Sequence, residues 1–61
     1  MPYYRLYHIH GAHFSRFDAF DAANDSLAVR EAESLNENGH AELWCAGHKI
    51  KRLFPRQDAE S

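Results

Sequence analysis

The sequence has little material for covalent cross-links and no segment long enough to cross a membrane. It holds one cysteine, Cys45, so no disulfide can form within the chain, and a lone thiol suits a reducing compartment. No apolar run approaches the roughly 18 residues that a membrane span needs. The start, MPYYRLYHIHG, also lacks the basic and apolar regions of a signal peptide. These absences predict a cytoplasmic protein with no membrane segment.

Net charge and length further limit the kind of protein that this chain can be. Seven basic and nine acidic residues give a net charge of -2, so the whole chain does not attract nucleic-acid phosphates. With 61 residues it can form one domain with one small core. A chain of this size buries only about 60% of the surface that its unfolded form exposes. Such domains often gain stability from a metal ion or from self-association.

Two segments near the N-terminus predict a β-hairpin. Residues 3–10, YYRLYHIH, are rich in aromatic and branched side chains and contain neither proline nor glycine. The Gly-Ala pair that follows is too short for any connection except an antiparallel one. In the next segment, HFSRFDAFDA, Phe14 and Phe20 share a face by alternation and Phe17 does not. The second strand is therefore expected either to carry a bulge or to be short and irregular.

A helix is expected to begin at Asn24 or Asp25, whose side chains can accept hydrogen bonds from first-turn amides. The acidic Asp25 also suits the positive end of the helix dipole. The pair Asn38-Gly39 supplies residues that tolerate the left-handed conformation and predicts the helix end. An alanine-rich stripe would let this helix lie close to a sheet. The stripe and its flanks consist of Ala28, Ala32, Leu35, Leu27 and Val29.

Residues 40–54, HAELWCAGHKIKRLF, predict a second hairpin that turns at Ala46-Gly47. A two-residue turn would set up one apolar contact, one ion pair and one cation–π contact across the strands. The predicted cross-strand pairs are Cys45–His48, Trp44–Lys49, Leu43–Ile50 and Glu42–Lys51.

These segments predict one α+β domain over residues 1–54, in the order ββαββ. Two hairpins would form a small antiparallel sheet, with one helix packed on one of its faces. Residues 55–61 are expected to be a flexible polar tail, because Pro55 stops the last strand. The expected core consists of Leu6, Phe14, Phe20, Leu27, Ala28, Ala32, Leu35, Leu43 and Ile50.

The order YRLY, a glycine, a helix and then GHAELW resembles a group of small uncharacterised bacterial proteins, mostly alphaproteobacterial, along residues 4–53. The resemblance implies a ββαββ fold and a bacterial cytoplasm. It implies no activity and therefore assigns no functional residue. Where such proteins are expected to carry a larger apolar residue, this chain has His8, which leaves open a role for the histidines.

Histidines and the cysteine form one candidate site, for a metal ion. His8 and His10 would project from one face of a strand, roughly 7 Å apart. Cys45 and His48 would close the second hairpin and could bind the same or another ion as thiolate and imidazole. A Cys-His₃ or His₃ set would require the first and third strands to adjoin. Structural zinc sites usually show two CxxC-type pairs, so ordinary histidines are the favoured interpretation, and no cofactor is expected.

No enzymatic activity is expected. Cys45 and His48 could form a dyad across the hairpin, but the sequence supplies no third orienting group and no substrate cleft. Asp18, Asp21 and Asp25 are better explained as helix-capping and solubilising residues.

Single-stranded nucleic acid is another candidate ligand. Arg5 and Trp44 together with Lys49 and Lys51 would interleave aromatic and basic side chains on the sheet, an arrangement that can stack bases. The chain lacks an RNP-like motif, however, and Glu42 would sit beside this patch. Nucleic-acid binding is therefore the less favoured function.

A protein interface explains the aromatic residues best. One helix covers only one face of a sheet, so Tyr3, Tyr7, Ile9 and Trp44 would form an apolar patch in water unless they pack on one another. Tyrosine and tryptophan are enriched where proteins meet. The sequence thus predicts a non-enzymatic interaction module that binds a second copy, as a homodimer, or a larger protein.

Overall fold

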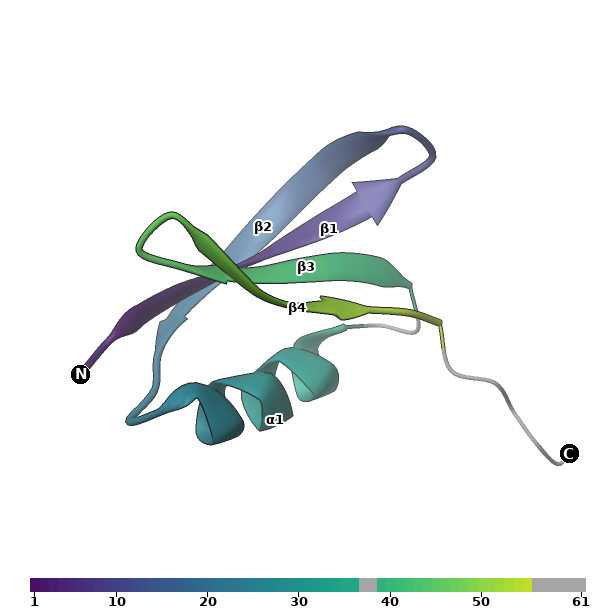
Figure 1. The fold of residues 1–61 in the computed structure, drawn as a ribbon. Coiled ribbons are helices and arrows are strands. Elements are labelled where there is room, and N and C mark those ends of the chain that lie inside the picture. The colour runs from purple at the N-terminus through teal and green to yellow at the C-terminus, as the bar shows by residue number, and fades with distance from the viewer. Residues whose placement is uncertain (37–38, 56–61) are drawn as a thin grey trace, which may run out of the picture.

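The computed structural model describes residues 1–36 and 39–55, which form four strands and one helix (Figure 1). Neighbouring strands are all antiparallel, in the order β2-β1-β3-β4, so the two hairpins join where β1 lies beside β3. The helix lies against one face of this sheet. The prediction of an α+β fold in the order ββαββ is confirmed. The elements are β1 (Tyr3–His10), β2 (His13–Asp21), α1 (Asp25–Leu35), β3 (His40–Cys45) and β4 (His48–Leu53).

Local sequence accounts for the turn of the second hairpin. Ala46 and Gly47 have φ angles of 52° and 80°, and a type I′ turn requires positive φ at both central positions. The expected turn at these two residues is therefore present. Of the predicted tail, Pro55 alone belongs to the described residues, and 56–61 lie outside them.

The helix begins as the sequence predicts and ends differently. The Asn24 side chain accepts a hydrogen bond from the Leu27 amide at 2.9 Å, and Asp25 opens the first turn. The helix ends before Asn36, whose side chain bonds both the amide and the carbonyl of Gly39. The predicted end at Asn38-Gly39 therefore lies beyond the observed one, and position 38 is outside the described residues.

A β-bulge in β2 confirms one of the two alternatives that the phenylalanine spacing left open. His8 pairs with Arg16 and Ile9 pairs with Phe14, so Ser15 is an extra residue in β2. Because side chains alternate along a strand, this insertion turns Phe14 onto the opposite face from the one that simple alternation predicts.

A second bulge, in β4, was not predicted. The pairs Cys45–His48 and Trp44–Lys49 are confirmed, but Ile50 is an extra residue in β4. The predicted pairs Leu43–Ile50 and Glu42–Lys51 are therefore wrong, because the insertion shifts every later pair by one position. The observed pairs beyond the bulge are Leu43–Lys51, Glu42–Arg52 and Ala41–Leu53.

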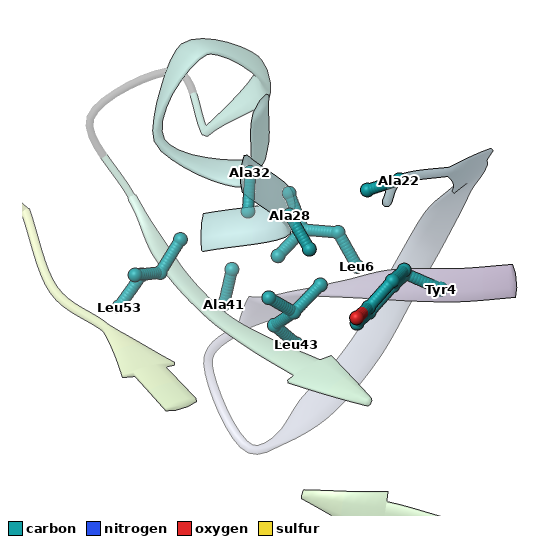
Figure 2. Packing of buried hydrophobic residues seen from close by; sticks show 8 residues of the cluster. All are labelled: Tyr4, Leu6, Ala22, Ala28, Ala32, Ala41, Leu43 and Leu53. Carbon is teal, nitrogen blue, oxygen red and sulfur yellow. The ribbon is translucent and has the colours of Figure 1, made fainter. Parts of the chain in front are cut away.

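The core lies between α1 and the sheet (Figure 2). Tyr4 is 1% exposed, and its ring stacks on Phe20 at a centroid distance of 5.8 Å. Its hydroxyl donates to a carboxylate oxygen of Asp25 at 2.6 Å, which joins β1 to the first turn of α1. That hydrogen bond raises the pKa of Tyr4 to about 12. The buried apolar residues are Tyr4, Leu6, Ala22, Ala28, Ala32, Ala41, Leu43 and Leu53.

The expected core is partly correct. Leu6, Leu43 and the two alanines of the helix stripe are buried, while Phe20, Leu35 and Ile50 are partly buried against them. Phe14 and Leu27 are 56% and 45% exposed, so their assignment to the core was wrong. The bulge at Ser15 turns Phe14 away from the helix. Leu27 lies at the flank of the helix stripe, and only its alanines are fully buried against the sheet. Core residues not predicted are Tyr4, Ala22, Ala41 and Leu53.

Candidate interaction surface on the open sheet face

The open face is the side of the sheet away from α1. Tyr4 and Leu6 point into the core, so the residues that alternate with them along β1 point the other way. Cross-strand partners share a face, which adds residues of the other strands. The aromatic residues of the open face are Tyr3, Tyr7, Phe14, Phe17 and Trp44, and its main charged residues are Arg5, Glu42, Lys49 and Arg52.

Aromatic rings dominate this surface. The ring of Tyr7 lies 5.2 Å from that of Phe14 and 5.6 Å from that of Phe17, centroid to centroid. Tyr3, Phe14 and Phe17 are each more than half exposed. All four residues of the predicted interface, including Ile9 and Trp44, lie on the open face. Sequence reasoning missed Phe14 and Phe17 as surface residues. The one signal for their exposure was that Phe17 breaks the period-two alternation of Phe14 and Phe20.

Arg5 lies among these rings. Its guanidinium carbon is 5.3 Å from the ring centroid of Phe17 and 6.0 Å from that of Tyr3. It also donates a hydrogen bond to the Tyr7 hydroxyl at 3.3 Å, which raises the pKa of Arg5 further. Within residues 1–36 and 39–55, no carboxylate forms an ion pair with Arg5. Its positive charge is therefore stabilised by aromatic faces and by solvent.

Glu42 is the buried carboxylate of the open face, 7% exposed. Trp44 Nε1 donates to one of its oxygens at 3.1 Å, and Arg52 donates to the other at 3.0 Å. Lys49 Nζ lies 3.6 Å from the same oxygen as Arg52. Three partners thus satisfy this carboxylate, and it positions the indole of Trp44. The sequence predicted Lys51 as the cross-strand partner of Glu42. Because the bulge at Ile50 shifts the register by one residue, Arg52 occupies that position instead.

Two shallow hollows flank the centre of the open face. One, of about 350 Å³, is lined by Tyr3, Arg5, Tyr7 and Trp44 and by the turn at residues 46–47. The other, of about 490 Å³, lies toward the first hairpin turn and includes Phe14, Glu42 and Arg52 in its lining. The surface therefore has relief into which another molecule's side chains could fit.

The predicted metal ligands do not meet. His8 pairs with Ala41 and Tyr4 with Cys45, so the two halves of the set lie four residues apart along the sheet, roughly 13 Å. Cys45 does lie opposite His48, as expected. In the described part of the chain, no three His, Cys, Asp or Glu residues are grouped so that they could hold a metal ion.

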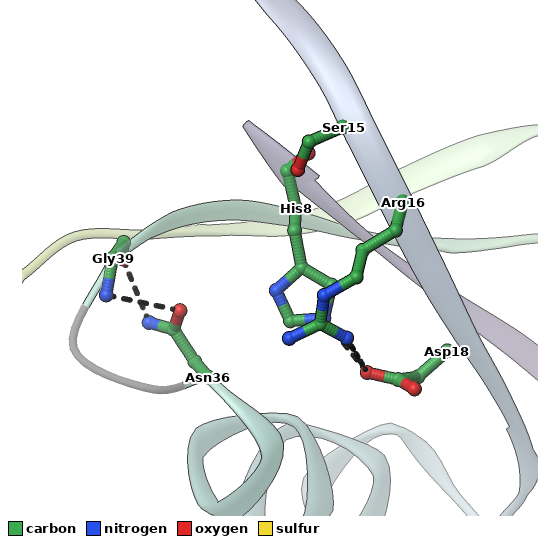
Figure 3. A network of polar contacts seen from close by, with 6 residues as sticks. All are labelled: His8, Ser15, Arg16, Asp18, Asn36 and Gly39. Atoms are coloured by element: carbon green, nitrogen blue, oxygen red, sulfur yellow. Dashed lines mark hydrogen bonds and ion pairs between the residues drawn. The ribbon is translucent and has the colours of Figure 1, made fainter. Parts of the chain in front are cut away.

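His8 belongs instead to a polar network on the helix side (Figure 3). It is 8% exposed, and its Nε2 lies 2.7 Å from a carboxylate oxygen of Asp18, to which Arg16 also donates at 3.3 Å. The hydrogen bond from His8 lowers the pKa of Asp18 below its ordinary value. Ser15, the bulge residue, donates to the carbonyl of His8. The network ties β1 to β2 beside the bulge.

Three of the four predicted nucleic-acid contacts are adjacent. Arg5 pairs with Trp44 and Trp44 with Lys49, across three strands of the open face. Lys51 pairs with Leu43 and its Nζ is 3.8 Å from Glu33 on α1, so it lies on the helix side. Its assignment to the aromatic patch was wrong, because the bulge at Ile50 reverses its direction.

No family model, curated protein or solved structure matches this chain. The resemblance to small alphaproteobacterial proteins therefore stays a prediction. Across the described residues, no helix is both long and apolar enough to span a bilayer.

Proposed function

We propose that this protein is a small non-enzymatic interaction module of the cytoplasm, which binds a second copy of itself through the open face to form a twofold homodimer. One observation carries the proposal: five aromatic side chains gather on the face away from α1, and three of them are more than half exposed. Apolar patches of this kind mark interaction surfaces. Glu42 accepts hydrogen bonds from two donors and forms an ion pair with Lys49, which suits a structural role better than proton transfer.

The edges of the sheet are poor surfaces for pairing. Both edge strands, β2 and β4, carry a bulge, and bulges interrupt the ladder that a further strand would extend. The outer strand β4 also carries Lys49, Lys51 and Arg52, which would repel the same strand of another copy. Association through the open face avoids both obstacles.

The free energy that association would gain by burying these rings is large for so small a protein. An aromatic side chain buries about 150–250 Å² when fully covered, so covering the exposed half of one ring removes about 100 Å² from water. At about 25 cal/mol per Å², each such ring contributes about 2.5 kcal/mol to association. Tyr3, Phe14 and Phe17 would each contribute twice in a symmetric dimer.

Light scattering after size-exclusion chromatography, between about 1 and 300 µM protein, tests the proposal. We expect the mass to rise to that of a dimer and the melting temperature to rise with concentration, because assembly stabilises the folded form. Phe17→Ala should weaken assembly, while Leu27→Ala, the loss of an exposed apolar residue on the helix, should not. A monomer at about 100 µM with a concentration-independent melt would refute the dimer. Tight binding of a single strand at physiological salt, lost in Trp44→Ala, would instead support nucleic acid as the ligand.

A further inference from the structure

The charges of the open face are unevenly neutralised. Lys49 and Arg52 share the carboxylate of Glu42, whereas Arg5 forms no ion pair within residues 1–36 and 39–55. A partner that covers this face removes water from Arg5. A buried cation without a counter-charge is costly, so the partner must supply a carboxylate.

Asp21 is a carboxylate at the same end of the open face as Arg5. Its cross-strand partner is Tyr3, so the two side chains share the open side of the sheet. Asp21 is exposed, and no cation pairs with it in the described parts of the chain. Arg5 pairs with Ala19, two residues before Asp21. An unpaired cation and an unpaired anion thus lie close together on one surface.

The two charges do not meet within one molecule. Diagonal neighbours in an antiparallel pair are about 7–8 Å apart, within reach of an arginine side chain. The guanidinium of Arg5 nevertheless lies nearer the ring of Phe17 and donates to the hydroxyl of Tyr7, which is the next residue on its face away from Asp21. The side chain is therefore held on the aromatic cluster and leaves Asp21 to solvent.

Twofold symmetry makes this arrangement self-complementary. In a symmetric interface, if residue i contacts residue j of the partner, then j also contacts i. We infer that the dimer axis passes between Arg5 and Asp21, so that each Arg5 pairs with Asp21 of the second copy. This inference rests on the proposed dimer. It adds that two reciprocal ion pairs select a second copy of this chain as the partner and set its orientation.

Charge reversal tests the pairing. Arg5→Asp alone places two pairs of carboxylates together in the dimer, and Asp21→Arg alone places two pairs of guanidinium groups together. Each variant should dimerise at least about tenfold more weakly than the wild type, because like charges in an interface repel. A mixture of the two variants should recover dimers of wild-type affinity, since the heterodimer restores both pairs. Sedimentation of each variant, and of the mixture with one partner labelled, measures this.

A matched charge swap on the other side of the sheet serves as the control. Lys51→Glu and Glu33→Lys reverse an exposed pair that lies on the helix side, and they should leave assembly unchanged. Circular dichroism would verify that every variant is folded. A wild-type dimer with no recovery on mixing would overturn the reciprocal pairs and leave the proposed function standing. A monomeric wild type would overturn both.

Discussion

Replacing Leu43 with alanine should destabilise the protein far more than the same replacement at Leu27. Leu43 is fully buried at the centre of the core, opposite Leu6 on β1 (Figure 2). Removing its outer carbons costs the lost burial and leaves a cavity, which together amount to about 2–5 kcal/mol. Leu27 is 45% exposed at the start of α1. Its loss should cost about 1 kcal/mol or less, because only part of the side chain leaves an apolar environment.

The difference between the destabilisation by Leu43→Ala and that by Leu27→Ala is a large fraction of the expected free energy of unfolding. A protein of this length is stable by about 3–9 kcal/mol. Since 1 kcal/mol shifts the melting temperature of a 60–100-residue domain by about 4–8 °C, Leu43→Ala should lower the melting temperature by at least about 8 °C. Urea unfolding followed by circular dichroism gives the free energies of unfolding directly. Both variants must be measured at one protein concentration, because self-association would change the apparent stability.

Equal losses at the two positions would refute this account of the packing. A larger loss for Leu27→Ala would mean that the helix is rotated, so that the flank of its stripe and not Ala28 and Ala32 faces the sheet. A change in the denaturant slope of only one variant would have to be excluded first, since it would signal an altered unfolded state.

Two further predictions concern the pH dependence of stability. Tyr4→Phe keeps the ring and removes the hydrogen bond to Asp25, the bond that raises the pKa of Tyr4 to about 12 in the wild type. The stability that this bond contributes should be present in the wild type below pH 10 and be lost as the pH rises to 12, so the melting temperature of the variant should fall less over that range. Equal declines in the two melting temperatures would count against the bond. Asp18→Asn should destabilise the protein at neutral pH, and its deficit should shrink as the pH falls below about 4, because the hydrogen bond from His8 lowers the pKa of Asp18 and the contribution is lost when that carboxylate is protonated. Urea midpoints between pH 2 and 7 measure the deficit, and one that stays constant with pH would contradict the role of the charge.

The elements of the fold could be predicted because their signals are local. The Asn24 cap, the turn at Ala46-Gly47 and the run without proline or glycine in β1 each act within a few residues. The end of the helix was less predictable. The helix ends at Leu35, and the side chain of Asn36 bonds the amide and the carbonyl of Gly39, an interaction that the residue pattern did not reveal.

Register could not be predicted in the same way. Along residues 49–52, KIKR, either Lys51 or Arg52 can neutralise Glu42, so the charge pattern fits the register with the bulge as well as the one without it. The single inserted residue, Ile50, decides the face of every later side chain. In β2 the spacing of the phenylalanines revealed an irregularity, but not that Ser15 was the insertion.

The candidate surface was predicted where a simple period of two holds. Tyr3, Tyr7 and Ile9 alternate along the unbroken strand β1, and all three lie on the open face. Phe14 and Lys51, both beyond a bulge, were assigned to the wrong face. Burial of Tyr4 could not be deduced either, because tyrosines occupy both faces of β1 and only the packing of α1 selects one of them.

The junction between β1 and β3 has a consequence for how the chain folds. Each hairpin closes through a two-residue turn, and hairpins form in about 1–10 µs. Pairing β1 with β3 instead closes a loop that contains all of β2 and α1, and such closure is entropically more costly and slower. Early docking of α1 through Tyr4 and Asp25 would shorten the part of this loop still free to move. The two hairpins should therefore form first, and their union along β1 and β3 should set the folding rate.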